Sequence, residues 1–132
     1  MGAWSVEPFG NDVAADWAWD LEETSQWDVV EDALRDALED AEVDHETAQI
    51  AVAAVEVIAH GLGRRTQCDA YTHEVEEFVV RAGRPPRDLV DLAAASLAAA
   101  TGPASELSTA WADAGDVGWS EAITRLRASL TD

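Results

Sequence analysis

The sequence contains no lysine and only one cysteine, Cys68. All eight basic residues are arginines, and they face 27 acidic residues, so the formal net charge is −19. One cysteine excludes a disulfide within the chain. The shortage of cations excludes the basic surface with which proteins displace counterions from phosphate, so we expect neither nucleic-acid binding nor attachment to an anionic membrane.

Long apolar runs are also missing. The longest, 48–59 and 92–100, fall short of the roughly 20 residues that span a bilayer. The N-terminus lacks a basic segment followed by an apolar one, so the sequence predicts a cytoplasmic protein. No phosphate-binding loop, dinucleotide-binding glycine pattern or nucleophile elbow is present, and we therefore expect no cofactor.

What is present predicts an all-α fold. The 132 residues suit one compact domain spanning 1–132, and 48% hydrophobic content is enough for a core. Apolar residues recur at helical spacing, and no alternating strand pattern occurs. After an ordered, non-helical lead-in at 1–10, we expect about six or seven short, largely antiparallel helices, at 12–23, 26–41, 45–60, 73–82, 86–100, 105–114 and 120–130.

Side chains with short polar groups mark the expected helix starts. These N-caps are Asn11 or Asp12, Ser25, Asp44 and Thr72. The helices at 45–60 and 86–100 are the richest in apolar residues, so we expect them to be the two central helices.

The acidic residues are unevenly distributed. Residues 1–63 carry 16 carboxylates and one arginine, a net charge of −15, whereas 64–132 carry a net charge of −4. The expected outer face of helix 26–41 contains Asp28, Asp32, Asp36, Glu39 and Asp40. Trp19 lies about 160° from the apolar stripe of its helix at 100° per residue. Either the N-terminal segment with Trp4 and Phe9 covers it, or it is exposed and is a candidate interface anchor.

Such a surface attracts a basic protein partner. Alternatively, the arginines of the second half pair with the acidic half of the same chain or of another copy. Pairing between copies would make the protein a homo-oligomer. Those that cluster in the sequence are Arg64, Arg65, Arg81, Arg84 and Arg87.

Candidate metal ligands and nucleophiles are few. Glu56 and His60 are spaced i, i+4 and could share a ligand, and His45 ends a single Glu-x-x-His match where a di-iron bundle needs two. A capping cluster at Asp44 and a histidine at a helix end explain these residues without a metal. Cys68 is predicted to be a small apolar residue near a helix start, not a thiol nucleophile.

The N-terminal pattern resembles a known family. Met1-Gly2-Ala3-Trp4, then Pro8-Phe9, then Asn11-Asp12-x-Ala14-x-Asp16-Trp17 is similar to the opening of bacterial members of domain-of-unknown-function family 4259. Ser105-Glu106-Leu107-x-x-x-Trp111 and the closing helix with Trp119 extend the resemblance over nearly the whole chain. The resemblance implies a small helical domain and no particular activity.

The opening motif has a structural interpretation. Trp4 and Phe9 are expected to fold over Trp17, while Asn11 and Asp12 cap the first helix. The alternative is that the same residues form a ligand pocket.

These observations favour a non-enzymatic, acidic protein-interaction module, of the inhibitor or immunity type, for a basic partner. One alternative is a small-ligand or metal-binding helical domain that uses Glu56, His60 and His45. The other is that the acidity serves only solubility or salt adaptation.

Overall fold

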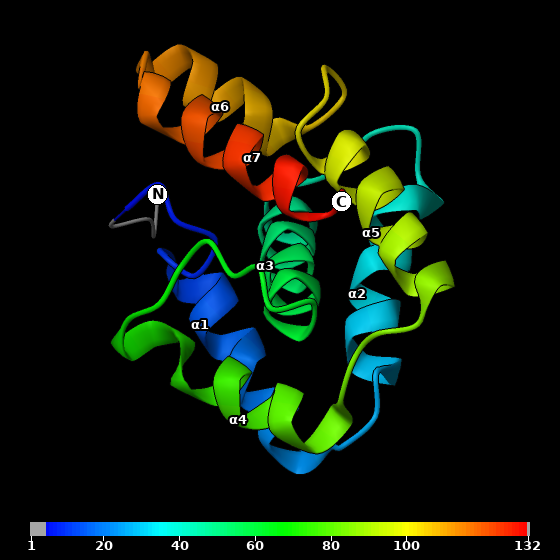
Figure 1. Cartoon of the computed structure of the whole chain (residues 1–132). Helices are drawn as coiled ribbons and strands as arrows, with labels where there is room; N and C mark the ends of the chain where they lie inside the picture. Colours follow the sequence, from blue (N-terminus) through cyan, green and yellow to red (C-terminus); the bar gives the residue numbers. More distant parts are fainter. Residues whose placement is uncertain (1–4, 132) are drawn as a thin grey trace.

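The structure, a computed structural model, describes residues 5–131, and its secondary structure is entirely helical (Figure 1). The expected all-α fold is therefore confirmed over this range. A parallel bridge between Val43 and Ser105 joins two loops. The elements are α1 (Asp12–Ala18), the 3₁₀ helix η1 (Trp19–Glu23), α2 (Asp28–Glu39), α3 (His45–Gly61), the 3₁₀ helix η2 (Ala70–Thr72), α4 (His73–Ala82), α5 (Arg87–Ala100), α6 (Glu106–Ala114) and α7 (Val117–Ser129).

Helix α3 is the centre of the domain. Every residue from 51 to 60 is buried, because this segment is apolar on almost all sides and a helix of that kind must be covered all round. The other helices surround α3, with α2 and α5 packed against it and against each other (Figure 1).

Helix α5 differs from the expectation of a second central helix. It buries one stripe that includes Leu89, Ala93 and Leu97, while Ala94, Ala95 and Ala98 face outward. Its high alanine content made the whole helix look apolar, although alanine is tolerated on a helix surface because of its high helix propensity.

Two predicted caps are confirmed. The side chain of Asn11 accepts a hydrogen bond from the N–H of Ala14 at 2.8 Å, and that of Asp44 accepts one from Thr47 at 2.7 Å. Asp12, the alternative cap, lies within the first turn of α1 and is exposed.

Three predicted helix starts were wrong. Ser25 is not a cap, because α2 begins at Asp28 after Trp27, and no side chain caps it. Thr72 makes no capping bond to α4 and instead closes a capping box with Asp69 around η2. Helix α7 begins at Val117, not near 120, because Asp116 accepts a hydrogen bond from Gly118.

The predicted first helix changes character part-way. Its α-helical part ends at Ala18 and continues as the 3₁₀ helix η1. The guanidinium of Arg81 on α4 donates to the carbonyl of Leu21 at 2.6 Å and to that of Thr24 at 3.1 Å. The Leu21 carbonyl also accepts the N–H of Thr24 at 3.4 Å, so Arg81 adds a side-chain donor at the end of η1 and ties it to α4.

The lead-in packs onto α1 as expected. Phe9 is fully buried and stacks on Trp17, with ring centroids 6.5 Å apart. A Cβ at Gly10 would collide with the side chain and carbonyl of Ser5, so only glycine fits at this turn. Trp4, the other expected cover of Trp17, lies outside the described residues.

None of the helices in the described range is both long and apolar enough to cross a membrane.

Candidate functional site

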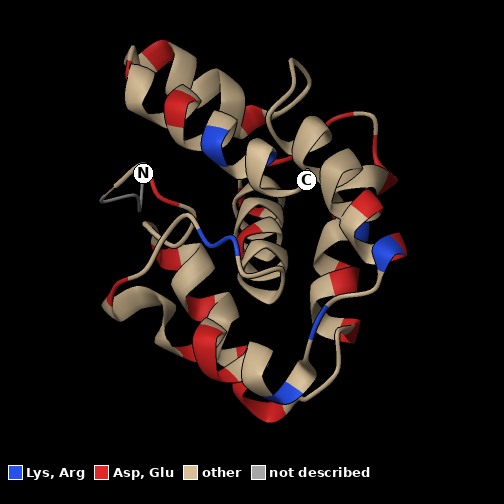
Figure 2. Cartoon of the chain, viewed as in Figure 1, with Lys and Arg blue, Asp and Glu red and all other residues tan. Residues whose placement is uncertain are grey.

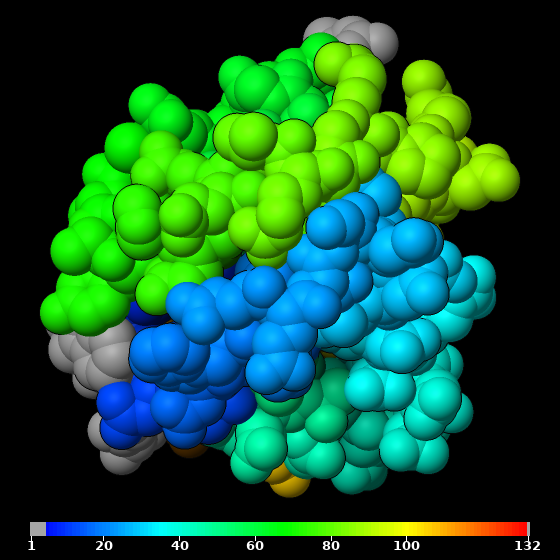
Figure 3. All heavy atoms as spheres, turned by 90° about the horizontal axis from the view of Figure 1, so that it is seen from below, coloured from blue at the N-terminus to red at the C-terminus, as the bar shows by residue number. Residues whose placement is uncertain are grey.

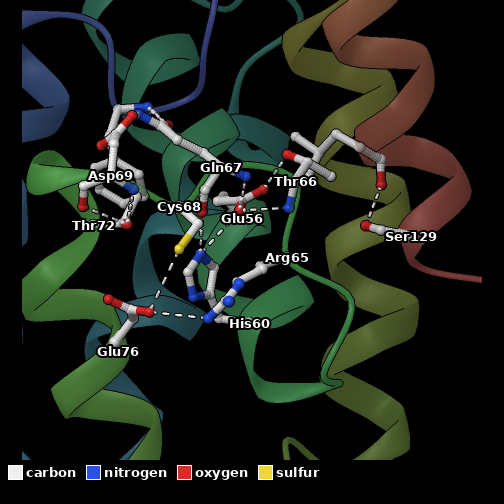
Figure 4. A network of polar contacts seen from close by, with 12 residues as sticks. Glu56, His60, Arg65, Thr66, Gln67, Cys68, Asp69, Thr72, Glu76 and Ser129 are labelled. Atoms are coloured by element: carbon white, nitrogen blue, oxygen red, sulfur yellow. Dashed lines mark hydrogen bonds and ion pairs between the residues drawn. The ribbon is translucent and has the colours of Figure 1, made fainter.

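A buried carboxylate organises the polar interior (Figure 4). Glu56 of α3 is fully buried, and its carboxylate accepts hydrogen bonds from the backbone N–H groups of Thr66 and Gln67, both at 2.9 Å. The Thr66 hydroxyl donates a third bond at 2.6 Å. The chain that leaves α3 therefore folds back onto its own helix and places its donors around this carboxylate.

His60 completes the same cluster. Its Nε2 lies 3.0 Å from Glu56 Oε2 and 3.0 Å from the carbonyl oxygen of Gln67. Both neighbours are acceptors, so Nε2 must carry a proton, and this nitrogen has no lone pair to offer a metal.

The network reaches the N-terminal lead-in through Gln67. Its Oε1 accepts from the N–H of Phe9 at 2.8 Å, and its Nε2 donates to Asp69 at 3.0 Å. Residues 58 positions apart in sequence are thereby joined by a buried amide, and the cluster has the connectivity of a structural anchor.

The candidate metal ligands are only partly brought together. Glu56 and His60 lie in contact, but His45 is at the opposite end of α3, about 22 Å from His60 at a rise of 1.5 Å per residue. The backbone N–H of His45 donates to Glu106 at 2.8 Å. Within residues 5–131, no group of three histidine, cysteine, aspartate or glutamate side chains has the arrangement that could hold a metal ion.

Cys68 does not have the expected apolar environment. It is exposed, and its Sγ lies 3.8 Å from Oε1 of Glu76, which also pairs with Arg65 at 3.0 Å. His73 is turned toward Glu77, with a separation of 3.5 Å, so it gives the thiol no base.

The cavity at the opening motif is too small for the alternative of a ligand pocket there. A cavity beside Glu7, Asn11 and Trp119 has a volume of about 20 Å³. That volume suffices for about one water molecule, not for an organic ligand.

Glu7 at this cavity is electrostatically unusual. Burial raises the pKa of its carboxyl, while Arg125, 3.6 Å away, opposes the shift. Glu56 and Asp69 raise the Glu7 pKa further because they carry like charge.

All the predicted interaction residues lie on the surface. Trp19 is 60% exposed, and the outward side chains of α2 are exposed as the helical period indicated. Figure 2 shows acidic positions over α1, η1 and α2, and Figure 3 shows η1 and α2 following one another across the underside of the molecule, beside α4. The exposed α2 carboxylates, called the α2 acidic face below, are those of Asp28, Asp32, Asp36, Glu39 and Asp40.

The arginines do not pair with the acidic half as a group. Arg65 binds Glu76, and Arg87 lies 3.5 Å from Asp91, so both have partners in the second half. Arg64, Arg84 and Arg87 meet Arg127 around a groove. The sequence gives no signal for that convergence, because it depends on how α3, α5 and α7 pack.

The sequence model of the family described as a domain of unknown function (DUF4259) matches residues 2–122. The chain belongs to this family. No curated protein and no solved structure is significantly similar to this DUF4259 domain.

Proposed function

We propose that this DUF4259 protein is a non-enzymatic interaction module that binds a basic protein through the α2 acidic face, in the manner of an inhibitor or immunity factor. The observation that carries the proposal is the arrangement of charge on α2. No arginine among the described residues forms an ion pair with any of the five carboxylates, and the one pair on this helix joins Arg35 to Glu31 at 2.8 Å.

This arrangement works against the stability of the helix. Asp28, Asp32 and Asp36 follow one another at i, i+4 spacing, where each like-charged pair destabilises a helix by about 0.2–0.5 kcal/mol. Glu39 and Asp40 lie at the C-terminal end, where negative charge opposes the helix dipole, and no basic residue occupies the last turn. Helix stability alone therefore does not account for the acidic face beyond Asp28 in the first turn, which supports a role of this face in binding.

Trp19 supplies a second contact of the kind that anchors interfaces. Its ring is exposed, and the acidic residues near it in the sequence, Asp16, Asp20 and Glu23, are exposed too. Tryptophan is enriched among residues that dominate binding energy, and its electron-rich face attracts arginine and lysine side chains. A basic partner would thus meet both charge and aromatic surface on the first third of the chain.

The non-enzymatic part of the proposal follows from the residues that could do chemistry. The Glu56 carboxylate is occupied by four donors, including His60. The Cys68 thiol faces the carboxylate of Glu76 instead of a base. Neither arrangement leaves an activated group poised toward a substrate.

The test compares two variants that remove the same charge. In the α2 variant, Asp32→Asn, Asp36→Asn and Glu39→Gln neutralise the acidic face. In the control variant, Asp88→Asn, Asp113→Asn and Glu121→Gln neutralise three exposed carboxylates on α5, α6 and α7. Tagged, full-length proteins are incubated with nuclease-treated extract of the native cell at low and high salt.

We expect a stoichiometric basic protein to bind the wild type and the control at low salt, to be released at high salt, and to be lost from the α2 variant. The α2 variant should be more stable than the wild type by about 0.5–1 kcal/mol, because two like-charged pairs are relieved, so lost binding cannot be ascribed to unfolding. Equal retention by both variants, or no bound protein, contradicts the proposal.

A further inference from the structure

A groove opens where the C-terminal ends of α3 and α7 meet the start of α5. It has a volume of about 480 Å³ and is lined by Arg64, Arg84, Arg87 and Arg127. Leu62, Val90 and Leu130 give it an apolar lining. Figure 1 shows the end of α7 beside α5, and Figure 2 shows basic positions at the entry to α5 and along α7.

The charge of this groove is opposite to that of the protein. Among the described residues, the lining contains half of the eight arginines of the chain and one carboxylate, that of Asp91, so these side chains carry a formal charge of +3. The arginines attract an anion only within the groove, because the chain as a whole has a net charge of −19 and repels anions elsewhere. A small anion fits within the attractive region, whereas a long one would extend into the repulsive field.

Two of these arginines are uncommitted. Arg84 and Arg127 make no hydrogen bond or ion pair with any residue in the described range, and both are exposed. Arg64, by contrast, is held in place, because it donates to the carbonyl of Thr131 at 2.7 Å. Among the described residues, the one partner of Arg87 is Asp91, 3.5 Å away, and because both side chains are largely exposed the pair adds little stability.

We propose that this groove binds a small organic phosphate. The guanidinium groups would hold the phosphate, since their planar forks match its oxygens in pairs, and the apolar part of the molecule would lie on Leu62, Val90 and Leu130. The three guanidinium groups of Arg84, Arg87 and Arg127 suit a phosphate dianion better than a singly charged carboxylate. The volume falls within the range of about 300–1,000 Å³ that is usual for small-molecule pockets.

A nucleic acid is a poor occupant. A polymer would extend beyond the groove onto the acidic surface, where each additional phosphate is repelled. The proposed ligand is therefore a discrete small molecule, and this site is independent of the α2 acidic face.

The test uses phenyl phosphate as the probe, with inorganic phosphate and benzoate for comparison, titrated into the full-length protein and followed by calorimetry. The groove variant is Arg84→Gln with Arg127→Gln, because neither side chain has a partner within residues 5–131 whose loss would unfold the protein. The control variant is Arg35→Gln with Arg125→Gln, which removes two arginines from elsewhere on the surface.

We expect saturable 1:1 binding of phenyl phosphate that is weakened about tenfold or more in the groove variant and less than about twofold in the control. Phenyl phosphate should bind more tightly than inorganic phosphate because of the apolar lining, and more tightly than benzoate because of its second charge. Absence of saturable binding, or equal weakening in both variants, overturns the proposal. Retention on phosphatidic acid vesicles without binding of phenyl phosphate also overturns it, in favour of a lipid surface.

Discussion

The buried carboxylate of Glu56 gives the sharpest test of how the fold is held together. Replacing Glu56 with alanine removes the acceptor for two backbone N–H groups, one hydroxyl and the His60 imidazole. Removing one partner from a buried, hydrogen-bonded charge typically costs about 3–5 kcal/mol, because the remaining groups stay buried without partners. That is a large part of the roughly 5–15 kcal/mol that stabilises a domain of ordinary size.

Glu56→Gln should cost much less. Oε2 accepts three of the four contacts, whereas Oε1 accepts only the Thr66 hydroxyl. The amide oxygen of glutamine can take the position of Oε2, and the Thr66 hydroxyl can rotate to accept from the new NH₂ group. Only the charge assistance of the bonds is then lost, which amounts to about 1–2 kcal/mol.

Urea unfolding monitored by tryptophan fluorescence separates the two variants. For an m value of about 2 kcal/mol/M, the midpoint should fall by about 2 M in Glu56→Ala and by about 0.5–1 M in Glu56→Gln. The surface substitution Glu121→Gln serves as the control and should change the free energy of unfolding by less than about 0.5 kcal/mol. Equal losses in both Glu56 variants, or a loss below about 1 kcal/mol in Glu56→Ala, would refute the role of this carboxylate as the anchor of the loop.

Three further predictions concern single side chains. Asp44→Ala should lower the unfolding free energy by about 1 kcal/mol because the α3 cap is lost, whereas Asp44→Asn should keep the cap. Hydrogen bonds to Thr47 lower the pKa of the Asp44 carboxyl, so its contribution to stability is present above the unfolded value of 3.8 and is lost as the pH falls through the folded pKa. Acid unfolding curves of both variants check this. Between pH 4 and pH 7, the stability of Glu7→Gln should rise relative to that of the wild type. Burial raises the pKa of the Glu7 carboxyl, so the wild type keeps its full stability below the unfolded value of 4.5 and loses part of it as the pH rises through the folded pKa. Urea titrations at pH 4 and pH 7 that show no such change would contradict this prediction. Trp19→Ala should change the unfolding free energy by less than about 0.5 kcal/mol, whereas Phe9→Ala should cost about 3–5 kcal/mol, and equal effects in thermal melts would place the two rings in similar environments.

The fold could be predicted where one local signal dominated. Helix α3 was identified because its apolar residues cover most of its circumference and Asp44 marks its start. The start of α2 was misplaced because Ser25 has the right chemistry for a cap, but the chain places Trp27 there and packs its ring edge-on against Phe78, 5.1 Å away. Tertiary packing overrode the local preference.

The surface and the interior differed in how far they could be predicted. The exposed face of α2 follows from the 3.6-residue period alone, so Asp32 and Asp36 were placed correctly. The Glu56 cluster was recognised only as an i, i+4 pair with His60, because its donors come from a loop whose path depends on the whole domain. The arginine groove could not be predicted either, since Arg84 and Arg127 are separated by more than 40 positions in the sequence.

The exposed thiol of Cys68 has a practical consequence for studying the loop that Glu56 holds. With no lysine side chains in the chain, maleimide chemistry at Cys68 and amine chemistry address entirely different positions. A fluorophore or spin label attached to this single sulfur would sit next to Gln67, whose backbone N–H is bound by the buried carboxylate. Its mobility would therefore report release of the loop directly, and a local opening could be told apart from global unfolding in the same sample.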